Sequence, residues 1–395
     1  MTIHRRAAPA ALFAVLFLVL AGSRADAAAS SFPPGYQQYH TYAEMTTELQ
    51  TVAAAHPGIV KLSSIGQSYQ GREIWMVKIS NNPGIDQKEP EVLITGLTHA
   101  REHLTVEQAL AVISWLVNGY GTNSTITHIV NTTEIWVAPM LNPDGGEYDI
   151  KGGHFHSWRK NRQPTPGSTA IGTDINRNFG YHWNCCGGSS SNPFSDIYHG
   201  PKPFSTPEAR VERKFVLSRI VNGKQQIVLA LSLHSFGQRV LYPYGYTRTA
   251  VPSDMIPADH AALKALAKGI ASRNGYIAIQ ESHWYITSGT FLDWSYGTQR
   301  ILTFTMEMAP GTASGGGFYA PGNQVAKLTQ HNRAALLWWI EQAQCPYDAS
   351  GQTHICSGAA AASTGAAAWA AGGVGMNGGA ALSAHVMARF RAIPV

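Results

Sequence analysis

Residues 91–117 read EVLITGLTHAREHLTVEQALAVISWLV. The apolar run at 92–94 predicts a buried strand, and apolar residues at helical spacing from Val106 to Val117 predict a helix. His99 and Glu102 therefore lie where the strand gives way to the helix, and residues three apart at a helix start share one face. A neutral imidazole and a carboxylate on one face can hold a zinc ion. An H-x-x-E pair also arises by chance, as a surface histidine with a first-turn glutamate that favours the helix dipole.

The composition is that of a globular chain. Of its 395 residues, 44% are hydrophobic and 13% are charged, and glycine is abundant. Such a chain can bury a sizeable core in one large or two ordinary domains. The formal net charge is +5, but the sequence contains no run of Lys or Arg. We therefore expect no binding to nucleic acid.

Residues 1–29 have the pattern of a signal peptide. Arg5 and Arg6 precede an apolar stretch at 10–20, and Ala25-Asp26-Ala27 fits the small-residue cleavage pattern. A membrane anchor is the alternative, but the apolar stretch is too short to span a bilayer. We expect a secreted, extracellular protein that has no membrane association once this segment is removed.

The cysteines of a secreted chain are expected to form disulfides. Four are present, which allows three pairings. A bond between Cys345 and Cys356 would close a short loop and is our first choice, and it leaves Cys185 and Cys186 as a vicinal pair. A zinc site made of all four cysteines is the alternative, but the C-x-x-C spacing is missing. Residues 357–395 are mostly Ala and Gly, which predicts a disordered tail or a truncated linker.

Apolar segments of strand length alternate with segments of helical spacing. This alternation implies an α/β fold with a buried, largely parallel or mixed sheet. Asn142-Pro143-Asp144-Gly145 predicts a turn, and the long irregular stretch at 152–200 predicts a functional loop. We predict helices at 42–55, 207–221, 258–272 and 323–343, and strands at 60–65, 74–79, 92–94, 134–140, 227–233 and 301–306.

Three side chains that can bind a metal or transfer a proton fall at or just beyond the carboxyl ends of predicted strands, namely His99, His234 and Glu307. Ligands of open α/β sheets bind at that edge. A catalytic zinc needs about three protein ligands, so His234 is the best candidate to join His99 and Glu102. Asp174 could orient His99 through its other ring nitrogen. A strand-end histidine with a structural hydrogen bond is the alternative for His234.

Glu307 is a candidate general base. Its place after an apolar strand should raise its pKa by desolvation, whereas a nearby zinc should lower it. A carboxylate beside metal-bound water suits proton transfer, although a buried Glu paired with an Arg is the alternative. Arg159 and Arg177 in the long loop can bind a carboxylate or stabilise an oxyanion. For Arg101 and Arg162 a solvated surface position is an equally good interpretation.

The ordered motifs of the chain resemble those of zinc carboxypeptidases of the carboxypeptidase A type. The resemblance covers about residues 38–346, and the Cys185-Cys186-Gly187-Gly188 and Cys345-Pro346-Tyr347 segments look most like secreted bacterial members. The motifs are His99-x-x-Glu102, Asn142-Pro143-Asp144-Gly145, Trp158-Arg159-Lys160, Asp174-x-Asn176-Arg177-Asn178, His234-Ser235, Tyr242-Pro243-Tyr244-Gly245, Tyr285, Asp293-Trp294 and Phe304-Thr305-x-Glu307.

The resemblance implies a fold and a division of roles. The fold would be a single α/β domain at 30–346 with a mixed, mainly eight-stranded sheet flanked by helices on both faces, followed by a disulfide-closed end and tail at 347–395. Zinc-bound water would attack the C-terminal peptide bond. The implied roles are one zinc per chain on His99, Glu102 and His234, Glu307 as base and then proton donor, Arg159 as carbonyl polariser, Asn176, Arg177 and Tyr285 as binders of the terminal carboxylate, and Arg101 in the adjoining subsite.

The chain departs from the family pattern at some positions, and the resemblance also implies which C-terminal residues the enzyme prefers. Phe236 stands where a Tyr is common, and no prodomain of the animal type fits before residue 38, which argues against an activation step. The pocket for the C-terminal side chain would be built from the stretch at 286–292, including Leu292, which contains no charge. Asp293 is shared by members of both preferences, whereas the direction of Glu281 is open. We therefore expect a preference for large apolar or aromatic C-terminal residues and poor use of Lys and Arg.

Two other functions remain on this scaffold. One is a non-catalytic binding protein, which we would expect to lack a metal ligand or the base; here His99, Glu102, His234, Glu307 and Arg159 are all present. The other is a specialised peptidoglycan peptidase. Arg177 argues against it, because this arginine favours substrates that end in an ordinary free α-carboxylate. We expect a monomer that acts on peptides or proteins with a free C-terminus.

Overall fold

The structure is a computed structural model that describes residues 31–357. The predicted signal peptide at 1–29 and the Ala- and Gly-rich tail from residue 358 onward lie outside the described residues. Among the described residues, no helix combines the length and apolar character that crossing a bilayer requires.

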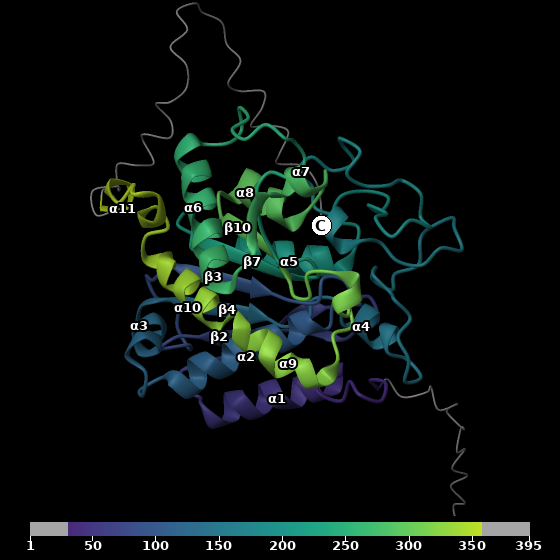
Figure 1. Cartoon of the computed structure of the whole chain (residues 1–395), viewed down its shortest axis with the longest axis horizontal. Coiled ribbons are helices and arrows are strands. Elements are labelled where there is room, and N and C mark those ends of the chain that lie inside the picture. Colours follow the sequence, from purple (N-terminus) through teal and green to yellow (C-terminus); the bar gives the residue numbers. More distant parts are fainter. Residues whose placement is uncertain (1–30, 358–395) are drawn as a thin grey trace, which may run out of the picture.

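One mixed sheet of eight strands forms the centre of the molecule (Figure 1). The neighbouring strands β4, β3, β7 and β10 run parallel to one another. β2 and β8 flank this group in the antiparallel direction, and β1 and β9 form the edges. The predicted mixed eight-stranded sheet is thus confirmed. Its order is β1 (Val60–Gln67), β2 (Glu73–Ile79), β4 (Glu134–Ala138), β3 (Glu91–Thr95), β7 (Ile227–Ser235), β10 (Leu302–Met308), β8 (Arg239–Tyr242) and β9 (Ile277–Gln280).

Helices cover both faces of the sheet because the central strands are apolar on both sides. Val92 and Ile94 of β3 belong to one hydrophobic cluster, and Leu93 belongs to the other. The first cluster includes side chains of α1, α2, α3, α6, α9 and α10, and the second includes those of α5 and α8. The helices are α1 (Tyr42–Ala55), α2 (Leu104–Gly119), α3 (Ser124–Thr132), α4 (Pro143–Asp149), α5 (Pro207–Ser218), α6 (Pro257–Asn274), α7 (Glu281–Trp284), α8 (Phe291–Gln299), α9 (Val325–His331), α10 (Arg333–Glu341) and α11 (His354–Ser357).

Two predicted helices have different bounds in the structure. The helix predicted at 207–221 ends at Ser218, because Ile220–Val221 (β5) pairs with Lys224–Gln225 (β6) in a small hairpin. The helix predicted at 323–343 is divided at Asn332 into α9 and α10. The buried Asn332 amide donates to Gln108 at 2.9 Å and accepts from Asn274 at 3.1 Å. These long-range hydrogen bonds satisfy the buried polar side chain of Asn332. Sequence periodicity does not reveal such partners, so it did not predict the break in the helix.

The predicted turn at 142–145 is instead the start of a helix. Asn142 caps α4 by accepting a hydrogen bond from the Gly145 backbone at 3.1 Å. Pro143 occupies the first helical turn, where its missing N–H costs nothing. The same residue types favour turns and helix starts, so the prediction was wrong because the chain continues as a helix after this cap.

The long stretch at 152–200 contains no α-helix and none of the named strands, as predicted. It contains one short 3-10 turn, Ile175–Arg177. The structure pairs Cys185 with Cys186 inside this stretch and Cys345 with Cys356 near the end of the described chain. These are the pairs that the sequence favoured.

Candidate metal centre and substrate site

His99 and Glu102 lie in the loop between β3 and α2. The sequence placed them on the first helical turn, but α2 begins at Leu104. The Glu102 backbone N–H donates to the His99 carbonyl at 3.1 Å. This tight turn, rather than a helix face, brings the imidazole and the carboxylate to the same side.

His234 comes from β7, the strand beside β3. β7 runs to Ser235 and β10 runs to Met308, so both strands end two residues later than predicted. His234 and Glu307 are therefore register partners on adjacent parallel strands. Because parallel strands end at one edge of the sheet, their side chains meet the β3–α2 loop there.

The three side chains present their ligand atoms to one another. His99 Nδ1 lies 2.9 Å from Glu102 Oε1, His234 Nδ1 lies 3.0 Å from Glu102 Oε2, and the two Nδ1 atoms are 3.1 Å apart. Ligands of a tetrahedral zinc are roughly 3.3 Å apart, because each lies about 2.0–2.1 Å from the metal. All three side chains are buried. The donor set therefore fits a zinc ion.

The other nitrogen of each imidazole is already engaged. His99 Nε2 lies 3.1 Å from Asp174 Oδ1, and His234 Nε2 lies 3.1 Å from Ser232 Oγ. These contacts leave both Nδ1 atoms available as ligands and fix the ring orientations. Asp174 was predicted for this position. Ser232 was not, although its place two residues before His234 on the same strand face would have indicated it.

A second acidic group among residues 31–357 does not match this chemistry. Asp86, Glu91 and Glu134 lie close together. However, Arg219 binds Asp86 and Glu91 at 2.6 and 2.5 Å, and Lys78 binds Glu134 at 2.7 Å. These cations already neutralise the carboxylates, so the group is an ion-pair network.

Asp174 also fixes Arg159. Its Oδ2 accepts hydrogen bonds from Arg159 Nε at 3.0 Å and Nη2 at 2.9 Å. Burial pushes the pKa of Asp174 up, but the charges of Arg159 and His99 outweigh it and hold that pKa well below its usual range. Arg159 Nη1 makes no such hydrogen bond with any residue that the structure describes, and it lies 4.0 Å from Glu102 Oε1. The guanidinium is thus held beside the ligand set with one nitrogen free.

Glu307 is buried without a cation to neutralise it through a hydrogen bond. Its carboxyl makes no hydrogen bond with any other residue of the described chain, and it is 7% exposed. Burial raises the pKa of Glu307 well above its ordinary value, and the Glu102 charge raises it further. Among the described residues, no Arg forms an ion pair with Glu307, so the alternative of a structural Glu–Arg pair is not found.

Arg177 and Asn176 lie together in the 3-10 turn of the long loop. Arg177 donates from Nε to the Gly188 carbonyl at 2.9 Å and from Nη1 to the Asn176 carbonyl at 2.7 Å. The Asn176 Oδ1 accepts from the Phe291 backbone at 2.9 Å. Arg177 Nη2 and Asn176 Nδ2 remain without a hydrogen bond within residues 31–357. Their donors are therefore available to an acceptor from outside the chain.

Tyr285 follows α7 and is 39% exposed. Desolvation raises the pKa of its phenol, as does the charge of Glu307, whereas the Arg177 charge lowers it. Leu292, in contrast, is buried in the first turn of α8.

The two arginines of ambiguous status have different surroundings. Arg101 donates to the Ser157 carbonyl and to Asp196, both at 3.2 Å, and lies 4.3 Å from the centre of the Phe318 ring. The Phe318 ring in turn packs edge-on against Phe236. Arg162 stacks on two rings of the 148–158 region, so its role is packing.

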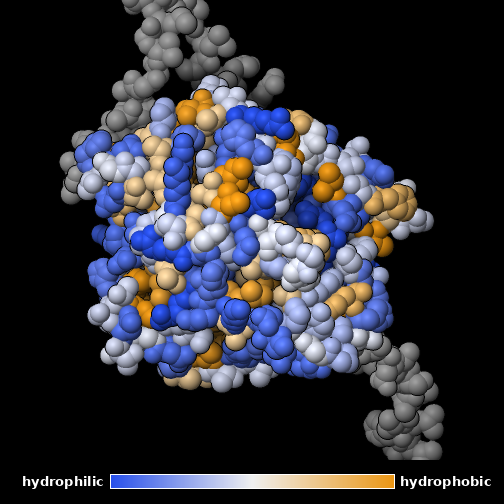
Figure 2. Space-filling model, in the orientation of Figure 1, coloured by the Kyte–Doolittle hydropathy of each residue, from blue (hydrophilic) through white to orange (hydrophobic). Residues whose placement is uncertain are grey.

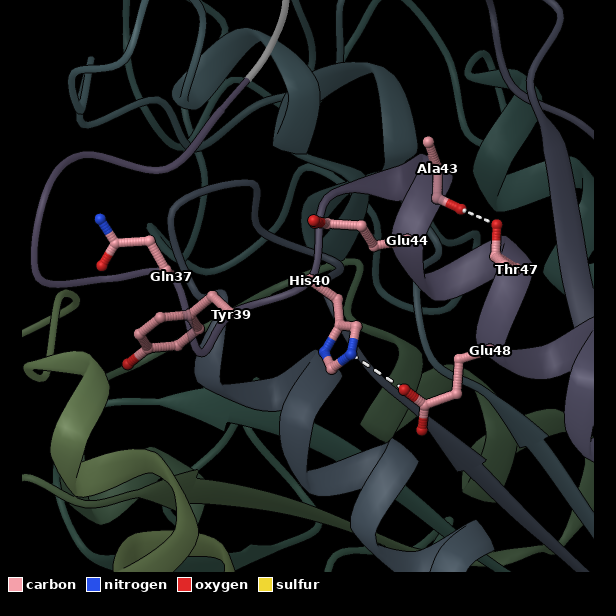
Figure 3. A pocket seen from close by; sticks show the side chains of 7 residues that line it. All are labelled: Gln37, Tyr39, His40, Ala43, Glu44, Thr47 and Glu48. Atoms are coloured by element: carbon pink, nitrogen blue, oxygen red, sulfur yellow. Dashed lines mark hydrogen bonds and ion pairs between the residues drawn. The ribbon is translucent and has the colours of Figure 1, made fainter.

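The surface is hollowed in more than one place. A hydrophilic hollow lies right of centre in Figure 2, beside the long loop that Figure 1 draws in teal. A separate hollow of about 430 Å³ lies at the start of α1 (Figure 3). There His40 contacts Glu48 at 2.9 Å. The second hollow contains none of the residues described above, and its lining is Gln37, Tyr39, His40, Ala43, Glu44, Thr47 and Glu48.

Comparisons with known proteins agree with this chemistry. The family model described as zinc carboxypeptidase matches residues 45–335. A zinc carboxypeptidase of Saccharothrix mutabilis subsp. capreolus is 45% identical over 314 residues, covering 80% of this chain and 71% of that protein. Human carboxypeptidase A1 is 32% identical over 308 residues, 78% of this chain and 70% of that protein. The crystal structure of carboxypeptidase A from Helicoverpa armigera superimposes with a TM-score of 0.66 at 27% identity, covering 79% of this chain and 74% of that one.

Proposed function

The chain belongs to the zinc carboxypeptidase family and is a metal-dependent hydrolase that uses one zinc ion. From that premise we propose that it is secreted and removes C-terminal residues from peptides and proteins, with a preference for large apolar or aromatic side chains. The observation that carries this proposal is the convergence of His99, Glu102 and His234 beside Glu307.

His99, Glu102 and His234 would hold the zinc ion. When bound, zinc supplies a Lewis acid that polarises a carbonyl and lowers the pKa of water. Asp174 and Ser232 keep the two imidazoles in the orientation that exposes Nδ1. The neighbouring Ser235 backbone N–H donates to Glu102 Oε2 at 3.2 Å and steadies that carboxylate.

Glu307 takes a proton from the attacking water while the water oxygen bonds to the scissile carbonyl carbon. It then gives the proton to the amine nitrogen as the C–N bond breaks. A raised pKa suits this exchange, because the group must both accept and release a proton near neutral pH. Arg159, fixed by Asp174, directs its free Nη1 at the developing oxyanion.

Arg177, Asn176 and Tyr285 bind the α-carboxylate of the substrate. Two unused N–H donors and a phenol, close to a buried guanidinium, match the acceptors of a carboxylate. This arrangement makes the enzyme an exopeptidase, because a peptide bond within a chain brings no such charge. Arg101, with Phe318 and Phe236, forms the adjoining subsite.

The preference for apolar residues is assigned to the pocket segment that includes Leu292. Burying a large apolar side chain there contributes roughly 1.5–3 kcal/mol. We further propose that residues 30–346 form the catalytic domain, that residues 1–29 direct secretion, and that the mature enzyme is a monomer.

The test is a panel of N-blocked dipeptides with C-terminal Phe, Leu or Ala, each as a free acid and as an amide. We expect hydrolysis of the free acids, in the order Phe and Leu above Ala, and little hydrolysis of the amides. Binding of the free acids without turnover would instead indicate a non-catalytic binding protein. Faster turnover of the amides would contradict the assignment as a carboxypeptidase.

A further inference from the structure

The disulfide between Cys185 and Cys186 has no role in the reaction described above. It lies in a turn at residues 184–187 of the long loop, which we call the disulfide turn. Cys186 and Gly187 are exposed and have positive φ angles of 65° and 76°, whereas Gly188 is buried. A residue other than glycine adopts this left-handed conformation only uncommonly. The chain therefore passes from the surface into the protein directly after the disulfide.

Gly188 connects the disulfide turn to the proposed substrate site. Its carbonyl accepts the hydrogen bond from Arg177 Nε at 2.9 Å, and both residues are buried. A Cβ atom at Gly188 would collide with the Thr287 backbone and would lie 2.6 Å from the Ser288 nitrogen. The next residue, Ser189, accepts a hydrogen bond from the Ser288 hydroxyl at 2.8 Å. Gly188 thus lies between the proposed carboxylate binder and the pocket segment at 286–292.

Few interactions hold the disulfide turn itself. Within the described part of the chain, its only hydrogen bond runs from the Gly188 N–H to the Cys185 carbonyl at 3.2 Å. The residues on either side, Trp183 and Ser190, are both hydrogen-bonded to the segment at 197–199. A surface turn with so few hydrogen bonds has many conformations open to it. The disulfide is therefore the main constraint on a turn whose two ends are fixed.

Arg177 depends on backbone carbonyls for its orientation. Gly188 holds its Nε, and the Asn176 carbonyl accepts from its Nη1 at 2.7 Å. The guanidinium is planar, so two fixed nitrogens also fix the direction of the third, Nη2. Nη2 is the donor that the proposed function assigns to the α-carboxylate of the substrate. A shift of the Gly188 carbonyl would therefore change how Arg177 meets that carboxylate.

We propose that the Cys185–Cys186 disulfide is a positioning element for substrate binding. It fixes the turn that delivers the Gly188 carbonyl to Arg177, and so it sets the affinity of the site for a free α-carboxylate. This inference rests on the proposed function, which gives Arg177 the carboxylate as its ligand. The zinc ligands and Glu307 make no contact with the disulfide turn through any hydrogen bond of the described residues. Loss of the disulfide should therefore act on binding and not on the chemical step.

The experiment measures kcat and KM of the Cys185→Ala/Cys186→Ala variant for a blocked dipeptide ending in Phe. Inhibition by L-phenylalanine and by its amide, which lacks the carboxylate, is measured in parallel. We expect KM and the inhibition constant of L-phenylalanine to rise about tenfold, the order of effect of one hydrogen bond to a charged group. The kcat and the inhibition constant of the amide should stay within about threefold. A purely structural role would lower kcat through the folded fraction without this division.

Cys345→Ala/Cys356→Ala is the matched control, because it removes the disulfide at the end of the described chain. It should lower the Tm and leave KM within about threefold of the wild type. In this control variant a phosphine reductant, removed before the assay, opens only the Cys185–Cys186 bond. Reduction should then raise KM about tenfold and reoxidation should restore it, even if the other variant folds poorly.

Two results would overturn the inference. One is an unchanged KM together with unchanged inhibition by L-phenylalanine after the disulfide is removed or reduced. The other is an equal change in the inhibition constants of L-phenylalanine and its amide. A wild type that hydrolyses none of the free acids would instead refute the proposed function itself.

Discussion

Replacing Asp174 by Asn should weaken zinc binding without creating a cavity in the core. The Asp174 side chain is fully buried, and the amide of Asn would occupy nearly the same volume. The carboxylate accepts from His99 Nε2, from two Arg159 nitrogens and from the Asn176 backbone. The substitution removes the negative charge that both His99 and Arg159 face. The side-chain oxygen of the new Asn at position 174 can still accept the hydrogen bond from the Asn176 backbone, so the turn that carries Asn176 and Arg177 is retained.

The magnitude follows from the position of Asp174 behind a ligand. Loss of a carboxylate that orients a metal-bound histidine typically weakens metal binding by about 10- to 100-fold, or roughly 1.4–2.7 kcal/mol. Arg159 loses its charged partner at the same time, so kcat/KM should fall by more than the metal term alone. We expect the combined loss in kcat/KM at saturating zinc to exceed about tenfold.

The assay is competition for zinc against a chromophoric chelator, with thermal unfolding measured in parallel. Asp149→Asn is a matched control, because Asp149 is equally buried and contacts His103 Nε2 at 3.0 Å, outside the ligand set. Asp149→Asn should lower the Tm but leave the zinc affinity within about threefold. Equal zinc affinity in the wild type and Asp174→Asn, or an equal loss in both variants, would refute this account of Asp174.

Three other outcomes are expected. Glu307→Gln should reduce kcat by several orders of magnitude and still bind one zinc; turnover within about tenfold of the wild type would show that Glu307 is not the base. Arg177→Ala should cost about 2–5 kcal/mol in kcat/KM on free-acid substrates and far less on amides, whereas an equal loss on both would indicate a structural role. Hydrogen bonds with Glu107 and Glu48 raise the pKa of His40 to about 10. The ion pairs of His40 therefore contribute fully to the free energy of unfolding below about pH 6.5, and this contribution is lost as the pH rises through 10. Urea unfolding should show the wild type about 1–2 kcal/mol more stable than His40→Gln after solvent screening, and this difference should disappear by about pH 10.5.

The central strands could be predicted because their side chains are apolar on both faces. The runs at 92–94 and 227–233 lie in β3 and β7, and the run at 301–306 overlaps β10 from residue 302 onward; these neighbouring parallel strands carry or precede the ligands and the base. The tendency of ligands to bind at the carboxyl edge of such a sheet then placed His99, His234 and Glu307 together from the sequence alone. That part of the site follows from local pattern and sheet topology.

The parts that could not be predicted depend on partners far away in the chain. Asn332 interrupts the last helix through Gln108, which lies 224 positions earlier. Glu281 carries no local signal for its direction, because its burial depends on Gly245 and Thr287. Single-sequence periodicity contains no information about such contacts. Ser232 is the intermediate case, because strand alternation indicates its face but not its bond to His234.

The central claim is that His99, Glu102 and His234 hold one catalytic zinc. The most direct measurement is the zinc content of the purified protein, followed by hydrolysis of a blocked dipeptide ending in Phe before chelation, after chelation and after stepwise return of zinc. We predict about one zinc per chain, no activity in the chelated sample, and full recovery at one equivalent, with His234→Ala failing to recover. Full activity in the metal-free sample, or full recovery in His234→Ala, would contradict the claim.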